Sequence, residues 1–171
     1  ARSRMSTTGQ AFLLMTLDAR KAARQAENST AQTSAANEDD SRANTLAAEL
    51  LASAKTQGDL SSWPVSADAL LEDVADTTVE ATALALQALA ARGTQDQTLE
   101  RAARWLMANR NNGYWISTKQ TAIALEGLLA FMKARGEKPA PVVAAVLVNG
   151  TRVATTRFDA ASLLAPNPTL I

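Results

Sequence analysis

Apolar side chains recur along most of this sequence with the spacing of one face of an α-helix. The stretch from Arg42 to Thr56 is the clearest example, because its apolar residues follow the i, i+3, i+4 pattern of an amphipathic helix. Applied to the whole chain, the pattern predicts five helices. They cover residues 8–27, 42–56, 78–92, 97–109 and 118–135.

The predicted helices alternate in character. The first, third and fifth carry apolar residues on nearly all sides, as in residues 11–15, 83–86 and 122–125, whereas the second and fourth have one apolar face. A helix that is apolar all round must be covered on several sides, and a helix with one apolar face lies outside. The alternation therefore predicts a two-layer stack of helical hairpins, as in a solenoid or an α/α toroid.

An internal repeat supports this stack. Residues 82–89 align with residues 121–128 at an offset of 39 positions, which is a typical length for a helical-hairpin repeat. A third, weaker copy begins at Ser6, which aligns with Ser117.

Residues that cap helices mark several of the predicted ends. Thr77 with Glu80, and Ser117 with Gln120, both fit the capping box, in which two side chains satisfy free backbone N–H groups reciprocally. The glycines that follow helix ends fit the left-handed position found there. These are Gly93, Gly113 and Gly136.

Two segments between the helices carry no regular pattern. Residues 28–40 are rich in Ser, Thr, Asn and Ala and are predicted to be a flexible linker, and residues 58–75 are predicted to be a long loop. After Pro141 the pattern changes to that of a β-hairpin, with Asn149-Gly150 as the turn between two strands. We therefore expect a partial toroid-like region over residues 1–138 and the start of a β-sandwich domain over residues 139–171.

The composition removes most kinds of catalytic site. The 171 residues include no cysteine and no histidine, which excludes thiol nucleophiles, disulfides, Cys/His zinc sites and histidine-based triads. The 17 basic and 17 acidic residues balance and form no basic stripe, so nothing indicates nucleic-acid binding. No apolar run approaches the roughly 20 residues needed to span a membrane. We expect no metal and no cofactor.

Two segments resemble a known family. Val79-Glu80-Ala81-Thr82-Ala83, and the run from Gly113 to Leu125 that contains Tyr114-Trp115-Ile116-Ser117-Thr118-Lys119-Gln120-Thr121, are similar to the VE-x-T-[SA] and GG-[FW]-x-STQDT-xx-AL segments of the alpha-2-macroglobulin and complement family. Their order and spacing match, and Ala103-Arg104-Trp105-Leu106 between them resembles an outer-helix segment of the family. The sequence departs from the pattern at Lys119 and Gln120, which replace Gln and Asp.

This resemblance implies a role in protease inhibition. Members of the family trap attacking proteases, and the helical domain shields a Cys–Gln thioester and then presents it. The thioester motif itself is absent from this chain, which has no cysteine. The residues that the family signature singles out are Glu80, Thr82, Tyr114, Trp115, Ser117, Thr118 and Thr121.

Each of these candidates also has a purely structural interpretation. Tyr114 and Trp115 either lie at a domain interface that protects the thioester or fill space between helices, and packing is the commoner use of aromatic side chains. Helix capping accounts for Ser117, and a nucleophilic role for Ser117, Thr118 or Thr121 would need a base that is missing.

Other polar features have ordinary explanations as well. The acidic residues Glu72, Asp73 and Asp76 faintly resemble carboxylate motifs of α/α-toroid enzymes, but acids before a helix also suit its positive end. The glycosylation sequons at Asn28 and Asn149 fit a loop and a turn.

The sequence therefore predicts a fragment of a macroglobulin-like protease inhibitor, and not an enzyme. A helical-repeat binding scaffold and an α/α-toroid enzyme remain as alternatives. Its partners would be target proteases and other domains of the same protein. The Ala/Arg-rich, cysteine-free composition is typical of a bacterial member of the family. The resemblance then implies a periplasmic or surface protein, of a kind that is often lipid-anchored. An apolar edge left without neighbours would make the piece self-associate or give it modest stability.

Overall fold

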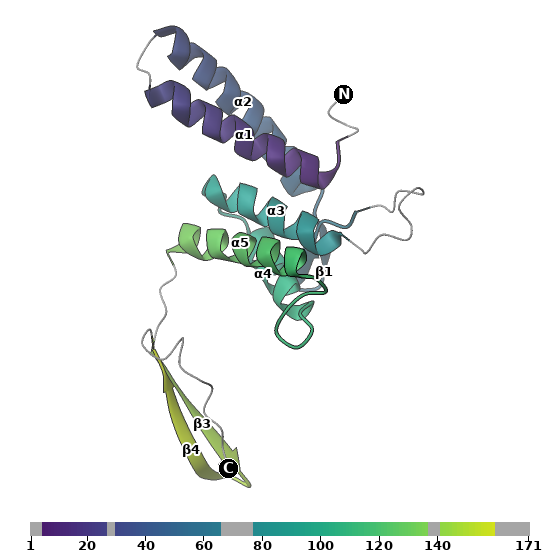
Figure 1. The fold of residues 1–171 in the computed structure, drawn as a ribbon, viewed down its shortest axis with the longest axis vertical. Coiled ribbons are helices and arrows are strands. Elements are labelled where there is room, and N and C mark those ends of the chain that lie inside the picture. The colour runs from purple at the N-terminus through teal and green to yellow at the C-terminus, as the bar shows by residue number, and fades with distance from the viewer. Residues whose placement is uncertain (1–4, 27–29, 66–76, 137–140, 160–171) are drawn as a thin grey trace. The chain divides into compact units, whose positions relative to one another are not determined.

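A computed structural model describes residues 5–26, 30–65, 77–136 and 141–159 of the chain (Figure 1). The chain divides into two compact units, residues 1–135 and 136–171, which are considered separately here. The predicted fold class, mainly helical with a following β-hairpin, is confirmed. The helices of the first unit are α1 (Thr7–Ala26), α2 (Thr30–Ala52), α3 (Thr78–Ala91), α4 (Gln97–Ala108) and α5 (Thr118–Arg135).

Helix α3 lies at the centre of the first unit, between α1 on one side and α5 on the other (Figure 1). Nearly all its side chains are buried, as the prediction of an inner helix requires. Helix α1 packs against both α2 and α3, whereas α5 packs mainly against α3. Both bury fewer residues than α3, and Phe12 of α1 and Leu129 of α5 are more than half exposed. Among the described residues, the prediction of cover on several sides is therefore confirmed for α3 and met only in part for α1 and α5.

The predicted repeat is visible in the contacts that join each outer helix to the next inner helix, which occur twice in the chain. After α2, Trp63 is buried, its indole N–H donates to the carbonyl oxygen of Leu50 at 2.8 Å, and its backbone N–H donates to Thr82 Oγ1 at 3.1 Å. One residue therefore binds a carbonyl in the last turn of α2, which also accepts hydrogen bonds from Ser53, and fixes the first turns of α3.

Trp115 repeats this arrangement after α4. Its indole N–H donates to the carbonyl oxygen of Leu106 at 3.1 Å, and its backbone N–H donates to Thr121 Oγ1 at 3.2 Å. Since Thr82 and Thr121 are the paired positions of the 39-residue repeat, the two hairpins share one hydrogen-bonding plan.

The segment predicted to be a linker is largely helical. Helix α2 begins at Thr30, twelve residues before the predicted start. Buried Asp39 accepts a hydrogen bond from Arg24 of α1 at 2.6 Å, and Asp40 pairs with Lys21 at 2.9 Å. These pairs hold the polar half of α2 against α1 without the apolar periodicity on which the prediction relied.

The segment after α2 also differs from its prediction. The helix ends at Ala52, and the strands β1 (Lys55–Gln57) and β2 (Leu60–Ser62) form an antiparallel hairpin in which Gln57 pairs with Leu60. Gly58 in the turn has a φ of +61°, a conformation that glycine adopts freely, and this allows the chain to reverse between the two strands. The rest of the predicted loop, residues 66–76, lies outside the described residues.

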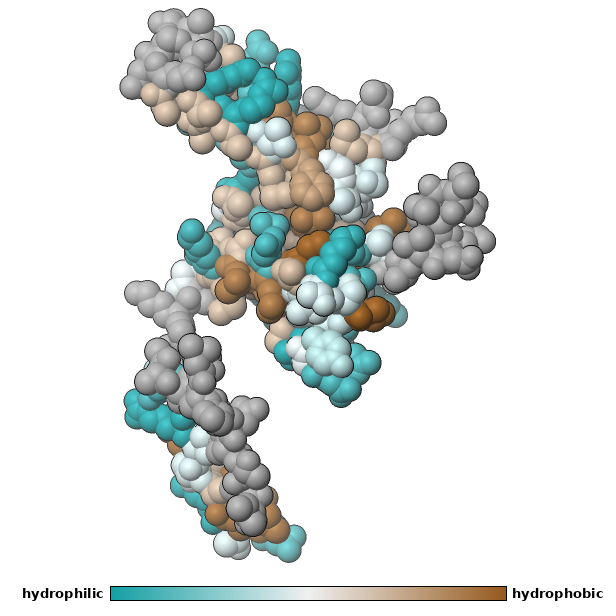
Figure 2. Space-filling view, viewed as in Figure 1, coloured by the Kyte–Doolittle hydropathy of each residue, from teal (hydrophilic) through white to brown (hydrophobic). Residues whose placement is uncertain are grey.

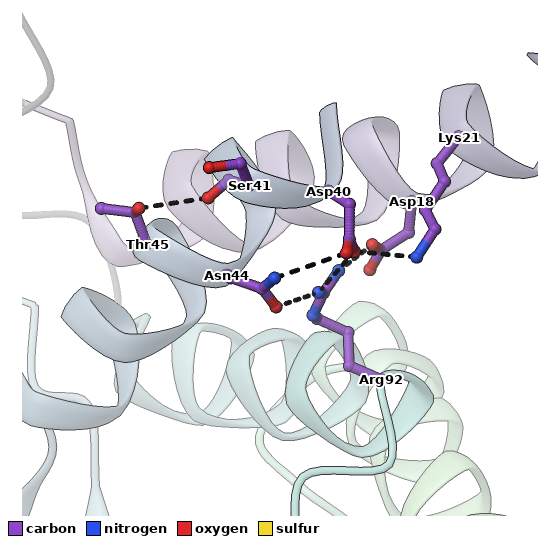
Figure 3. A network of polar contacts seen from close by, with 7 residues as sticks. All are labelled: Asp18, Lys21, Asp40, Ser41, Asn44, Thr45 and Arg92. Atoms are coloured by element: carbon purple, nitrogen blue, oxygen red, sulfur yellow. Dashed lines mark hydrogen bonds and ion pairs between the residues drawn. The ribbon is translucent and has the colours of Figure 1, made fainter. Parts of the chain in front are cut away.

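A polar network joins the α1–α2 hairpin to the end of α3 (Figure 3). The Arg92 guanidinium, which follows α3, donates to Asp18 of α1 and, on α2, to Asp40 at 3.2 Å and Asn44 at 2.6 Å. Hydrogen bonds from Lys21 and Arg92 hold the pKa of Asp40 below its usual 3.8. Burial raises the pKa of Asp18 above 3.8, although Arg92 acts in the opposite direction.

We expect Asp40→Asn to lower the free energy of unfolding at pH 7 by about 0.2–1 kcal/mol, the range of partly exposed ion pairs. Because the folded pKa of Asp40 is depressed, its contribution is present above pH 3.8 and is lost as the pH falls through the folded pKa. Urea unfolding over a series of pH values should therefore show the deficit at pH 7 and its progressive loss below pH 3.8.

Asp18→Asn is the matched control for this prediction. The raised pKa of Asp18 means that its stabilising contribution is present below pH 3.8 and is lost as the pH rises through the folded pKa. Asp18→Asn should therefore not reproduce the loss at pH 7, and equal losses for both variants would contradict the assignment.

The second unit is a β-hairpin of β3 (Val142–Val148) and β4 (Thr151–Phe158). The strands are antiparallel, and Val148 pairs with Thr151 across the predicted Asn149-Gly150 turn. Both turn residues have positive φ, 50° and 82°, as a tight two-residue turn requires. The wider β-sandwich remains a prediction.

Candidate functional site

The two segments that carry the family signature meet where α3 and α5 begin. Glu80 lies in the first turn of α3 and is buried, with only 7% of its surface exposed. Lys119 Nζ lies 3.0 Å from Glu80 Oε1, and Gln120 Nε2 donates to Glu80 Oε2 at 3.5 Å. The positive end of α3 and these two partners together allow a carboxylate to be buried here.

Lys119 and Gln120 are the positions at which the sequence departs from the family pattern. Both side chains contact Glu80, so the departure supplies an amine and an amide to this carboxylate. The side chain of Lys119 is otherwise 72% exposed, so its pairing with Glu80 takes place at the edge of the buried region. These positions therefore couple the two signature segments.

The two predicted capping boxes have different outcomes. Ser117 Oγ accepts the backbone N–H of Gln120 at 3.1 Å, so Ser117 caps α5. Thr77 makes no side-chain capping hydrogen bond, and the prediction is wrong there. The physical reason lies in the backbone of Thr77, whose φ of −92° and ψ of 13° depart from the extended conformation that an N-cap residue usually has.

The two signature aromatics lie in different environments. Trp115 is buried, with 3% of its surface exposed, so the packing interpretation holds for it. Tyr114 is 56% exposed and closes a two-residue turn through backbone hydrogen bonds with Asn111 of 2.7 and 3.2 Å. Tyr114 is therefore not a space filler between helices.

An open pocket of about 520 Å³ lies at this turn. Ile116 is one of its walls and is 77% exposed, which is high for a large apolar side chain. The hydroxyls of Thr82 and Thr121, by contrast, are engaged by the backbone N–H groups of the two tryptophans. The residues that line the pocket are Tyr114, Trp115, Ile116, Ser117, Thr118 and Thr121.

The described ranges were also searched for clusters of metal-binding side chains. Among those residues, no group of three or more His, Cys, Asp or Glu side chains could hold a metal ion. The acidic residues Glu72, Asp73 and Asp76 lie outside the described residues. No helix in the described part of the chain is long and apolar enough to cross a membrane.

The family model of the A-macroglobulin TED domain matches residues 8–131, which is more than half of the chain. The chain belongs to this family. The match covers all five helices and both signature segments, apart from the first residue of α1 and the last turn of α5. Searches of the curated proteins and of the solved structures gave no match.

Two residues with central roles in this TED domain were not singled out from the sequence. Trp63 is the counterpart of Trp115. The sequence offers one signal for it, because Trp63 lies between an outer helix and Thr82, as Trp115 lies between an outer helix and Thr121. Arg92 joins three helices, but an isolated arginine at a helix end gives no such signal.

Proposed function

We propose that this chain forms the supporting helical scaffold of the thioester-containing domain in a macroglobulin-type protease inhibitor, and that it is not an enzyme. The observation that carries the proposal is the contact of Glu80 with Lys119 and Gln120, which joins both signature segments at one end of neighbouring helices. Such a scaffold holds other parts of the protein in place and supplies no reacting group of its own.

The chemistry at the signature residues supports a scaffold. Ser117 Oγ accepts a backbone N–H, as do Thr82 Oγ1 and Thr121 Oγ1, so these hydroxyls act as acceptors that fix the backbone. The chain has no histidine to activate them as nucleophiles and no cysteine to form a thioester. Any thioester would therefore use residues outside this sequence.

The exposed part of the signature provides a surface for another domain of the same protein. Tyr114 and Ile116 present apolar surface next to the cap at Ser117. Exposed aromatic and branched side chains at a pocket are typical of contact sites. On this proposal the target proteases meet the whole inhibitor, which works in the periplasm or at the surface of a bacterium and is held by a lipid anchor.

The test uses the natural full-length protein that carries this chain, mixed with an active protease. We expect the protease to lose activity on large protein substrates while it keeps activity on small peptides, because a trapped protease is shielded and not blocked. A covalent conjugate on a denaturing gel that disappears after methylamine pretreatment would show that the trap uses a thioester. A protease that stays fully active on large substrates would overturn the proposal and favour a binding scaffold.

A further inference from the structure

The end of the α1–α2 hairpin that points away from α3 is held together differently from the rest of the helical unit (Figure 1). It consists of residues 19–26 of α1 and residues 34–40 of α2, and we call it the hairpin tip. Alanine is the only apolar residue type in these two ranges. In Figure 2 this end of the hairpin is coloured teal and tan, and the brown of strongly apolar side chains begins nearer to α3.

The apolar core of the unit ends before the tip. Leu17 is the last buried residue of α1, and Ala43 is the first residue of α2 in the core cluster. Of the tip residues, Ala36 and Asp39 are buried. Hydrophobic stabilisation scales with the apolar area removed from water, so it is small here. Because the tip has no row of large apolar side chains, no neighbouring element could supply much of it either.

A buried ion pair holds the two helices of the tip together. The side chain of Asp39 is 1% exposed, and its Oδ2 accepts a hydrogen bond from Arg24 at 2.6 Å and lies 3.6 Å from Nε of Arg20. Its other oxygen, Oδ1, is buried and has no hydrogen-bond partner among the described residues. Arg24 also donates to the carbonyl oxygen of Ala35 at 3.1 Å. The guanidinium of Arg24 therefore provides most of the compensation for a buried charge.

We propose that the hairpin tip opens and closes as one unit while the rest of the helical unit stays folded, and that the Arg24–Asp39 pair controls this opening. An unpaired carboxylate is costly to bury, so Asp39 must reach water once Arg24 leaves it, and this separates the two helices. Segments with few buried apolar contacts open at a lower free energy than the core does. The tip combines both properties.

The Arg92 network lies at the boundary between the tip and the core (Figure 3). Asp40 is the last residue of the tip, and it binds Lys21 at 2.9 Å and Arg92 at 3.2 Å. Asp18 and Asn44 also accept hydrogen bonds from Arg92, and both lie on the core side of the tip. Opening the tip therefore removes one of these three partners of Arg92. The tip is a device that changes how firmly the hairpin is fixed to the end of α3.

Hydrogen exchange followed by mass spectrometry tests the proposal on the full chain, in urea concentrations below the main unfolding transition. Amides of the tip should exchange through an opening that costs less free energy than the one that exposes α3. Asp39→Asn keeps the shape of the side chain but removes its charge. It should speed exchange in the tip by about tenfold or more and leave exchange in α3 and α5 unchanged. Arg24→Gln should have the same effect, because it removes the other partner.

Glu38→Gln is the matched control. Glu38 is next to Asp39, but its side chain is 66% exposed and pairs with Arg42 within α2. Exposed pairs of this kind contribute little, so exchange in the tip should not change. Equal exchange of the tip and α3 in the unmodified chain would overturn the proposal. So would an acceleration by Asp39→Asn that extends through α3, or an equal acceleration by Glu38→Gln.

Urea unfolding with two probes gives an independent measurement. The three tryptophans, Trp63, Trp105 and Trp115, all lie outside the tip, so their fluorescence reports on the core, whereas circular dichroism reports on every helix. In Asp39→Asn the helical signal should begin to fall at a lower urea concentration than the fluorescence signal changes. Coincident curves in this variant, or a fluorescence spectrum that is already unfolded without urea, would contradict an opening confined to the tip.

Discussion

Replacing Gly127 with alanine is expected to lower the free energy of unfolding of the helical unit by about 1–3 kcal/mol, the usual cost of forcing extra volume into a packed core. In an ordinary helix interior the same change would raise stability by about 1 kcal/mol. The sign reverses here because the new Cβ would lie 2.6 Å from the carbonyl oxygen of Ala83 and 3.1 Å from its Cα. These are backbone atoms of buried α3, so they have little room to move away.

Gly9→Ala in α1 is the control for this prediction. A Cβ at Gly9 would meet Met5 Cγ at 2.8 Å, but that atom belongs to a flexible, partly exposed side chain that can turn aside. Gly9→Ala should therefore leave stability unchanged or raise it slightly. Urea unfolding followed by tryptophan fluorescence measures both variants, and a stabilised Gly127→Ala would show that α3 and α5 are not in such close contact.

The repeat in the sequence places Gly127 in an inner helix, but it does not show that Gly127 is in close contact with α3. The alignment places Gly127 opposite Ala88 of α3, both small residues in inner helices. It does not give the distance between the two helices, because that distance depends on which side chains meet across the contact. The inner position of α3 was predictable from its continuous apolar run. The partial exposure of α1 and α5 was not, because periodicity shows how apolar a helix is and not how many neighbours it has.

Polar contacts between helices account for the largest error. Residues 30–40 have no apolar row, so the pattern predicted a linker where the first half of α2 forms. The side chains that hold this half, Asp39 and Asp40, pair with Arg24 and Lys21 of α1, about 15 to 20 residues away in sequence. Helix propensity would have been the better signal, since alanine recurs at positions 31, 35 and 36.

The candidate site was predictable as two segments but not as one cluster. The family motifs placed Glu80 and Ser117–Thr121 in the chain, and capping explained Ser117. The contact of Glu80 with Lys119 and Gln120 depends on the side-by-side packing of α3 and α5, and both partners are positions where the sequence leaves the family pattern. Motif matching alone would have treated those two positions as uninformative.

Trp63→Ala is expected to have the largest effect on stability, a loss of about 3–5 kcal/mol. Trp63 is 1% exposed, and it connects the end of α2 with the start of α3 through its indole N–H and its backbone N–H. The substitution removes a large buried side chain together with the indole hydrogen bond to the Leu50 carbonyl, which Ser53 also binds. A loss of this size is a large part of the total stability of a domain, so we expect a fraction of this variant to be unfolded in the absence of urea.

Trp63→Phe separates the loss of the indole hydrogen bond from the loss of buried volume, and it remains measurable if the alanine variant does not fold. Phenylalanine keeps most of the apolar volume and the backbone N–H that binds Thr82, but it has no indole N–H for Leu50. We expect a loss of about 0.5–1.5 kcal/mol in urea unfolding, the net contribution of one hydrogen bond, because the Leu50 carbonyl keeps its hydrogen bonds from Ser53. Trp115→Phe should give a loss of similar size, because its indole makes the equivalent bond to Leu106. A neutral Trp63→Phe beside a costly Trp115→Phe would contradict this expectation. The two indole hydrogen bonds would then have the same geometry but would contribute differently to the free energy of unfolding.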